Sequence, residues 1–303
     1  MTAPNQRHTA LIKLLVFIIS LLISNLIFAA ASSQKDTLIA VSDNVTLRVI
    51  EAGPHDAQTI VLIPGWSFTA DIWNKQIEAL GDRYHIIAID PRSQGRSTIL
   101  NHSNSPDYRA SDVFNLIKKL DLHKPVLVGW SQGVQDVAAY AMNYGTDSIG
   151  GIVFVDALVS GGAAELDGKM AAMVLGRMPI YVNNQREYLE GMMSYIFKKP
   201  LSPAELNTIV SAALHTPTSI GVANLVLDLF GKDYRPAFKH IKAPTLLIIA
   251  GTAPDKNAQM QQPIPNVTTE VIEGAGHTVF YDEPVKFNDA LVQFLKERVE
   301  TRK

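Results

Sequence analysis

A serine flanked by two glycines is the part of this sequence that most directly suggests chemistry. Gly129-Trp130-Ser131-Gln132-Gly133 follows a short apolar run and precedes a stretch with helical character. A strand that turns sharply into a helix holds the serine in a strained conformation and exposes its hydroxyl above the sheet edge. The glycines suit this turn because a Cβ at either position would collide with the neighbouring chain. We therefore expect Ser131 to be a nucleophile.

A serine hydroxyl is a weak nucleophile unless a base takes its proton and a carboxylate orients that base. His277 is the expected base because it follows the last predicted strand within Gly274-Ala275-Gly276-His277. A loop at this place allows the imidazole to turn toward Ser131. The acid must then come from an aspartate or glutamate that another strand end brings to His277.

The elements that must position these residues alternate along the chain. Apolar runs typical of strands buried on both faces cover residues 59–63, 84–89, 125–130, 151–155 and 245–250, and residues 268–272 form the last predicted strand. Amphipathic stretches typical of helices lie between or after them, including residues 113–120 and 284–299. This alternation predicts βαβ units, and therefore a parallel sheet with helices on both faces. Residues 37–41 and 45–51 form a predicted hairpin before them.

The order of these blocks resembles the α/β-hydrolase fold of the esterase, lactonase and cofactor-free haloperoxidase type. Four blocks carry the resemblance: Pro64-Gly65-Trp66, Asp90-Pro91-Arg92 with Gly95-Arg96-Ser97, Gly129–Gly133 and Gly274–His277. The resemblance implies an α/β architecture with a mostly parallel eight-stranded sheet, helices on both faces and a helical cap after the sixth strand. Two positions depart from the family pattern, since Pro64 stands where histidine is usual and Val134 where a second glycine is common.

The resemblance also implies a division of the chain into a core and a cap. Residues 32–159 and 236–303 form the expected core, and residues 160–235, where the strand pattern stops, form the expected cap. Methionine and aromatic residues are frequent in the cap segment, which suits an adaptable apolar lining. We expect the partner to be a small-molecule substrate with a hydrophobic acyl or ring portion.

Two aspartates compete for the role of the triad acid. Asp255 follows the strand at 245–250 and precedes His277, which is the expected chain order of serine, acid and histidine. Asp156, at the end of the strand at 151–155, is the alternative that some members of this fold use. The sequence favours Asp255 and leaves Asp156 open. The expected oxyanion hole consists of the backbone N–H groups of Trp66 and Gln132.

This set of residues implies hydrolysis of a carboxylic ester or lactone through an acyl-serine intermediate, with no metal and no organic cofactor. Hydrolysis of an amide or C–C bond uses the same triad and stays open, as does a ligand-binding member of the fold without turnover. Zero cysteines exclude a thiol nucleophile and a cysteine-ligated metal. A net charge of −2 offers no basic footprint for nucleic acid, so no such partner is expected.

The first 31 residues have the pattern of an export signal. A basic start at Arg7, His8 and Lys13 precedes the apolar run at 14–28, and Ala29-Ala30-Ala31 fits a cleavage site. The run of about 15 residues is short for a bilayer span of roughly 20. We expect cleavage after Ala31, export to the periplasm or beyond, and no stable membrane insertion afterwards. A retained N-terminal membrane anchor is the alternative.

Overall fold

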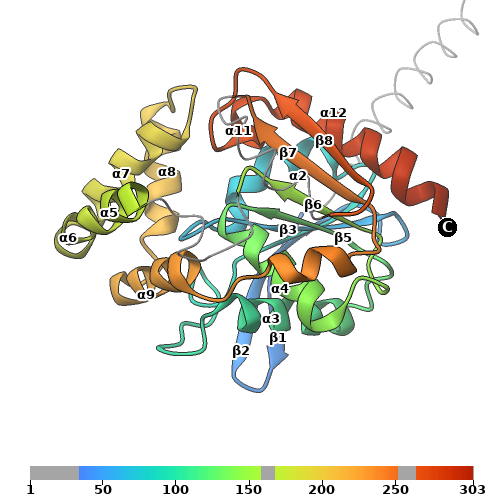
Figure 1. Ribbon diagram of the computed structural model, residues 1–303, viewed down its shortest axis with the longest axis horizontal. Coiled ribbons are helices and arrows are strands. Elements are labelled where there is room, and N and C mark those ends of the chain that lie inside the picture. Colours follow the sequence, from blue (N-terminus) through green and yellow to red (C-terminus); the bar gives the residue numbers. More distant parts are fainter. Residues whose placement is uncertain (1–33, 158–167, 252–263, 303) are drawn as a thin grey trace, which may run out of the picture. The chain divides into compact units, whose positions relative to one another are not determined.

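The computed structural model describes residues 34–157, 168–251 and 264–302 (Figure 1). These residues form an eight-stranded sheet in the order β1-β2-β4-β3-β5-β6-β7-β8. The strands are β1 (Lys35–Ser42), β2 (Val45–Ala52), β3 (Thr59–Ile63), β4 (His85–Ile89), β5 (Val126–Trp130), β6 (Gly151–Val155), β7 (Thr245–Ala250) and β8 (Val267–Ile272). Strand β2 is antiparallel to both β1 and β4, and the other pairings are parallel. The predicted fold class is confirmed.

Both faces of the central sheet are buried, which is why these strands are apolar without interruption. In β3, Ile60 and Leu62 enter one buried cluster, whereas Val61 and Ile63 enter the other. Successive side chains of a strand point to opposite faces, and each fully buried isoleucine or leucine contributes about 1.5–3 kcal/mol. The two layers therefore hold the strand ends firmly in place.

Helices cover the two faces of the sheet. Helices α2 (Asn74–Leu80) and α12 (Pro284–Phe294) contribute side chains to one cluster, and α3 (Pro106–Lys119) and α4 (Gln132–Tyr144) to the other. Short helical elements complete the core, namely η1 (Ala70–Trp73), η2 (Arg235–His240), α11 (Val279–Asp282), η3 (Leu295–Val299) and η4 (Glu300–Arg302).

The described part of the predicted cap is helical. It contains α5 (Gly168–Gly176), α6 (Met178–Asn183), α7 (Gln185–Ile196), α8 (Pro203–Ala213) and α9 (Thr218–Phe230), which group beside the sheet at the left of Figure 1. Tyr181, Leu189 and Met193 of these helices share a buried cluster with Trp66 of the core. The cap is thus packed onto the loop that follows β3.

Several predicted features lie outside the described residues, namely the export signal at 1–31, the start of the cap at 160–167 and Asp255. Within the described ranges, we find no single helix long and apolar enough to cross a membrane. Helices α8 and α9 pass that test only as a pair, by length and composition, with a bend of 86° between them.

The parallel register brings three loops together at one edge of the sheet. Ile63 pairs with Gly129 across β3 and β5, and Trp130 pairs with Val155 across β5 and β6. The residues that follow these strands are therefore neighbours, although the chain separates them widely. These residues are Pro64 after β3, Ser131 after β5 and Asp156 after β6.

Candidate active site

Ser131 joins β5 to α4 in the strained conformation expected from the sequence. Its φ is 54° and its ψ is −119°, a combination that costs of order 1–3 kcal/mol and persists only where the surroundings impose it. Its N–H donates to the Val155 carbonyl oxygen over 3.2 Å, and its own carbonyl accepts from Val134 over 3.0 Å. A Cβ on Gly133 would lie 2.5 Å from the Ile63 oxygen, so only glycine lets the helix start this close to β3.

His277 contacts both Ser131 and a carboxylate. Its Nε2 lies 3.0 Å from Ser131 Oγ, and its Nδ1 lies 2.8 Å from Asp156 Oδ2. When Nδ1 carries the proton and donates it to Asp156, Nε2 has a free lone pair directed at the serine hydroxyl. The Trp130 Nε1–H donates to the His277 carbonyl oxygen over 2.8 Å and fixes the loop that carries the imidazole. This geometry can transfer a proton from Ser131 to His277.

Asp156 is held rigidly at the end of β6. Its side chain is 2% exposed, and its Oδ1 accepts from the Ala250 N–H over 3.0 Å. Its own N–H donates to the Ile248 oxygen over 2.9 Å. Because each carboxylate oxygen has its own hydrogen-bond partner, the group cannot rotate without disturbing these contacts. The carboxylate thus presents one fixed oxygen to His277.

The structure brings the alternative acid, Asp156, to His277. Asp255 lies in the segment 252–263, outside the described residues. An imidazole has a single Nδ1, and Asp156 occupies it at 2.8 Å. The pairing of β5 with β6 places Asp156 one residue beyond the partner of Trp130, and this neighbour relation is absent from the chain order.

The two predicted oxyanion donors belong to segments that adjoin Ser131. Gln132 is the first residue of α4, so its N–H has no carbonyl acceptor within the helix. The loop before Trp66 approaches so closely that a Cβ on Gly65 would be 2.9 Å from Ser131 Cβ. Across the part of the chain that the structure describes, the Trp66 backbone N–H has no acceptor. Both amides are thus available to an anionic oxygen formed at Ser131.

Sequence reasoning missed the side chain that holds this loop. The Oε1 of Gln94, in the loop after β4, accepts from the Ser67 N–H over 3.0 Å. Its Nε2 donates to the carbonyl oxygens of Gly65 and Phe68 over 3.2 and 2.9 Å. Gln94 is fully buried, and it ties the segment around Trp66 to the core. A buried glutamine in a loop that also contains glycine and serine carries no sequence signal of this role.

A cavity of about 240 Å³ lies next to Ser131 and His277. Its walls come from the core and from the cap, and they are mostly apolar. The lining residues are Trp66, Phe68, Trp130, Ser131, Met173, Val174, Arg177, Tyr188, Met192, Tyr195, Ile196, Leu225 and His277. The predicted hydrophobic lining from the methionine-rich segment is present here, in Met173 and Met192.

A buried ionic network, which sequence reasoning also missed, joins the cap to the helix behind Ser131. Arg109 Nε donates to Asp136 Oδ1 over 2.7 Å, and its Nη2 donates to Asp228 Oδ1 of α9 over 3.0 Å. The Gln132 side-chain amide donates to the other oxygen of Asp228. Burial raises the pKa of Asp136 to about 7, against the opposing effect of the Arg109 charge. The residue after the nucleophile is thus coupled to the cap by charged groups away from water.

Comparisons with known proteins give a consistent picture. The sequence pattern of the Alpha/beta hydrolase family matches residues 60–290. The chain is similar to a non-heme chloroperoxidase of Burkholderia pyrrocinia, with 36% identity over 108 residues, 35% of this chain and 39% of that relative. It is 26% identical to the N-formylmaleamate deformylase of Pseudomonas putida over 249 residues, 78% of this chain and 88% of that one. The solved structure of an esterase from Exiguobacterium antarcticum has a TM-score of 0.79 at 21% identity, covering 87% of this chain and 100% of that one.

Proposed function

The chain belongs to the Alpha/beta hydrolase family, and on that premise we propose that it cleaves a carboxylic ester or lactone through an acyl-serine intermediate. The observation that carries the proposal is the continuous contact from Ser131 Oγ to His277 and from His277 to Asp156, at 3.0 and 2.8 Å. This is the arrangement that nucleophilic catalysis by serine requires. In the proposal Asp156 takes the place of Asp255 as the triad acid.

In the first half of the reaction, Ser131 Oγ attacks the carbonyl carbon while His277 Nε2 takes the hydroxyl proton. The carbonyl oxygen becomes an anion, which the N–H groups of Trp66 and Gln132 stabilise. The imidazolium of His277 is stabilised by the Asp156 carboxylate. It then gives its proton to the leaving alkoxide, and the acyl group stays on Ser131.

In the second half, water attacks the acyl carbon while His277 again acts as the base. The acid is released, and Ser131 recovers its proton. Removal of one oxyanion donor typically costs a factor of about 10²–10³ in kcat. A substitution cannot remove a backbone N–H group. Substitutions at Gly65 or Gln94 can instead displace the loop that carries the Trp66 N–H.

The cavity supports a substrate with a small or medium hydrophobic acyl or ring portion. Its volume of about 240 Å³ lies below the roughly 300 Å³ at which pockets for drug-sized ligands begin. Most of its wall is aromatic, methionine or aliphatic. Amide hydrolysis is the second candidate, because one relative is named N-formylmaleamate deformylase and matches over most of its length.

A fluorophosphonate probe and a set of nitrophenyl esters test the proposal. The probe should label the wild-type protein and leave Ser131→Ala unlabelled, and turnover should be highest for short and medium acyl chains. A protein that neither reacts with the probe nor turns over any ester would instead be a ligand-binding member of the family. Labelling that persists in Ser131→Ala would move the nucleophile to another residue.

We also propose that residues 1–31 direct export and are then removed. The support is the sequence pattern of a basic start, a short apolar run and Ala29-Ala30-Ala31. N-terminal sequencing of the protein exported by its own host should begin at Ser32 or within one or two residues of it. An intact N-terminus in the membrane fraction would show a retained anchor instead.

A further inference from the structure

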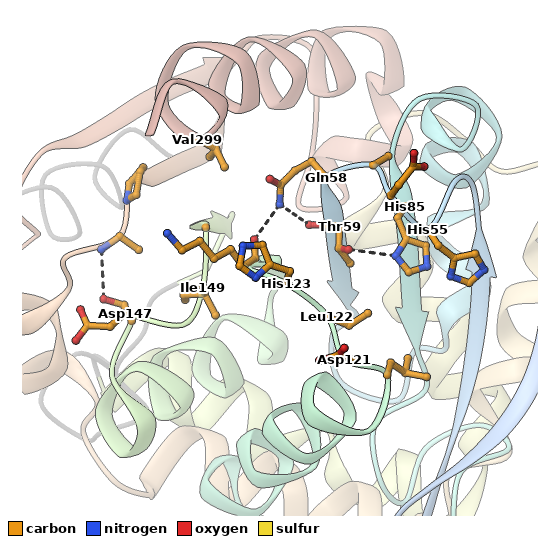
Figure 2. A pocket seen from close by; sticks show the side chains of 18 of the residues that line it. His55, Gln58, Thr59, His85, Asp121, Leu122, His123, Asp147, Ile149 and Val299 are labelled. Carbon is orange, nitrogen blue, oxygen red and sulfur yellow. Dashed lines mark hydrogen bonds between the residues drawn. The ribbon is translucent and has the colours of Figure 1, made fainter. Parts of the chain in front are cut away.

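A second and larger cavity lies at the opposite edge of the sheet from Ser131. Its volume is about 840 Å³, and it is lined by Thr59 and His85, the first residues of β3 and β4 (Figure 2). Ser131 follows the last residue of β5, so the length of a five-residue strand, about 16 Å, separates the two edges. The larger cavity is therefore separate from the proposed catalytic residues.

Three side chains with metal-ligating atoms meet beside this cavity, and two of them, His55 and His85, line it. Glu51 belongs to β2, His55 to the turn after β2, and His85 to β4. His85 Nε2 lies 2.8 Å from Glu51 Oε1, and His55 Nδ1 lies 3.5 Å from the same oxygen. All three ligand atoms are within 4.8 Å of one another, and Figure 2 shows the two imidazole rings side by side.

The spacing of these atoms suits a single small cation. Two ligand atoms bound about 2.1 Å from a tetrahedral zinc ion are about 3.4 Å apart, and the separations of 2.8 and 3.5 Å lie on either side of this value. The remaining distance is the one between the ring nitrogens of His55 and His85. The side chain of His55 is 69% exposed in a turn, so it can rotate to shorten this distance. Two imidazole nitrogens and one carboxylate oxygen form a donor set that zinc prefers and that calcium and magnesium do not.

The charge at this place also favours a cation. The side chains of His85 and Glu51 are only 3% and 15% exposed. Among the residues that the structure describes, no lysine or arginine pairs with Glu51, whose ionic contacts are the two histidines. A shielded carboxylate needs a positive partner or a strong donor, which here is either an imidazole N–H or a metal ion.

A supporting contact holds His85 in the orientation that a metal ligand needs. Thr59 Oγ1 lies 3.1 Å from His85 Nδ1, drawn as a dashed line in Figure 2, and the two residues are register partners in β3 and β4. With a metal on Nε2, Nδ1 keeps the proton and donates it to the Thr59 hydroxyl. Such outer contacts fix the tautomer and ring of ligating histidines.

We propose that Glu51, His55 and His85 bind a zinc-class divalent cation beside the larger cavity, with water in the remaining coordination position. The cation would tie the exposed turn around His55 to the buried start of β4. Because it binds the folded chain, its occupancy should raise the unfolding temperature. It lies too far from Ser131 to take part in ester hydrolysis.

Calorimetric titration of the untagged full chain with zinc chloride at pH 7.5, after removal of metal with EDTA, tests this site. We expect one equivalent to bind, and we expect Glu51→Gln and His55→Ala each to weaken the affinity at least about tenfold. Thr59→Val keeps the shape of the side chain but removes the contact to His85, and should weaken binding by about 10–100-fold. His123→Ala is the matched control, because His123 lines the same cavity outside the cluster.

Further readouts separate the site from nonspecific binding to surface histidines. Binding should weaken at pH 5.5, since protons compete with the metal for the imidazoles, and ester turnover should be unchanged in His55→Ala. Wild-type affinity in both Glu51→Gln and His55→Ala would overturn the proposal, as would the lack of saturable binding at 100-fold excess zinc. The remaining interpretation would then be a metal-free hydrogen bond from His85 Nε2–H to Glu51.

Discussion

Replacement of Asp156 by asparagine tests the proposed triad most directly. The Asp156 Oδ1 accepts from the Ala250 N–H over 3.0 Å, and Oδ2 faces His277 Nδ1 over 2.8 Å. An asparagine side chain has an oxygen that accepts and an NH₂ group that donates at the positions of these two carboxylate oxygens. Its oxygen must stay on the Ala250 N–H, because two opposed donors would leave a buried N–H unsatisfied at a cost of about 1–3 kcal/mol. Its NH₂ group therefore faces His277.

This orientation reverses the tautomer of His277. Nδ1 must now accept from the amide, so Nε2 carries the proton and can no longer accept one from Ser131. Restoring the correct tautomer costs the same 1–3 kcal/mol, a factor of about 5–150 in rate. The lost carboxylate charge no longer stabilises the imidazolium, so the total should approach the factor of about 10⁴ known for the equivalent change in a serine protease.

The assay is the kcat of Asp156→Asn and Asp255→Asn against a nitrophenyl ester, with circular dichroism as the check on folding. Asp156→Asn should lose about 10³–10⁴ in kcat, and Asp255→Asn should stay within about tenfold of the wild type. Both variants should remain folded because the substitution preserves shape. The opposite ranking, with a larger loss in Asp255→Asn, would refute the reasoning and return the acid to the segment 252–263.

Three further predictions concern the nucleophile, the oxyanion loop and the buried network. Ser131→Ala and His277→Ala should each reduce kcat by roughly 10⁴–10⁶, and the double variant should be hardly worse, because both remove the same step; losses that multiply would contradict a shared role. Gly65→Ala places a Cβ 2.9 Å from Ser131 Cβ and should lower kcat by about 10²–10³ through displacement of the oxyanion donors, whereas an unchanged kcat would show that the loop does not contribute. Burial raises the pKa of Asp136 to about 7 from a usual value of 3.8, so the folded state holds a proton that the unfolded state releases. The contribution of Asp136 to the free energy of unfolding is therefore fully present below about pH 4 and is lost as the pH rises to about 7. Between pH 4.5 and 7.5, the free energy of unfolding measured by urea titration should therefore fall less in Asp136→Asn than in the wild type. An equal fall in both proteins would argue against this role of Asp136.

Local sequence was sufficient for the elements that depend on near neighbours. An apolar run that leads directly into Gly-x-Ser-x-Gly can form little other than a buried strand and a tight turn, and β5 and Ser131 follow that expectation. Both faces of β3 are buried, so its strand character is visible in every residue. His277 was identifiable for a similar reason, because glycines beside it mark a loop after the last strand.

The tertiary structure alone decided which distant groups meet. Chain order favoured Asp255, but the sheet places β6 beside β5, so Asp156 reaches His277 across 121 positions of sequence. Arg109 and Asp228 are likewise 119 positions apart, and neither has a local pattern that predicts burial. The pattern of apolar residues along a strand indicates which of its faces are buried, but it does not indicate which strand lies next to it. Strand order follows from the packing of the whole sheet, and it therefore determines which side chains meet at His277, between cap and core, and at Glu51.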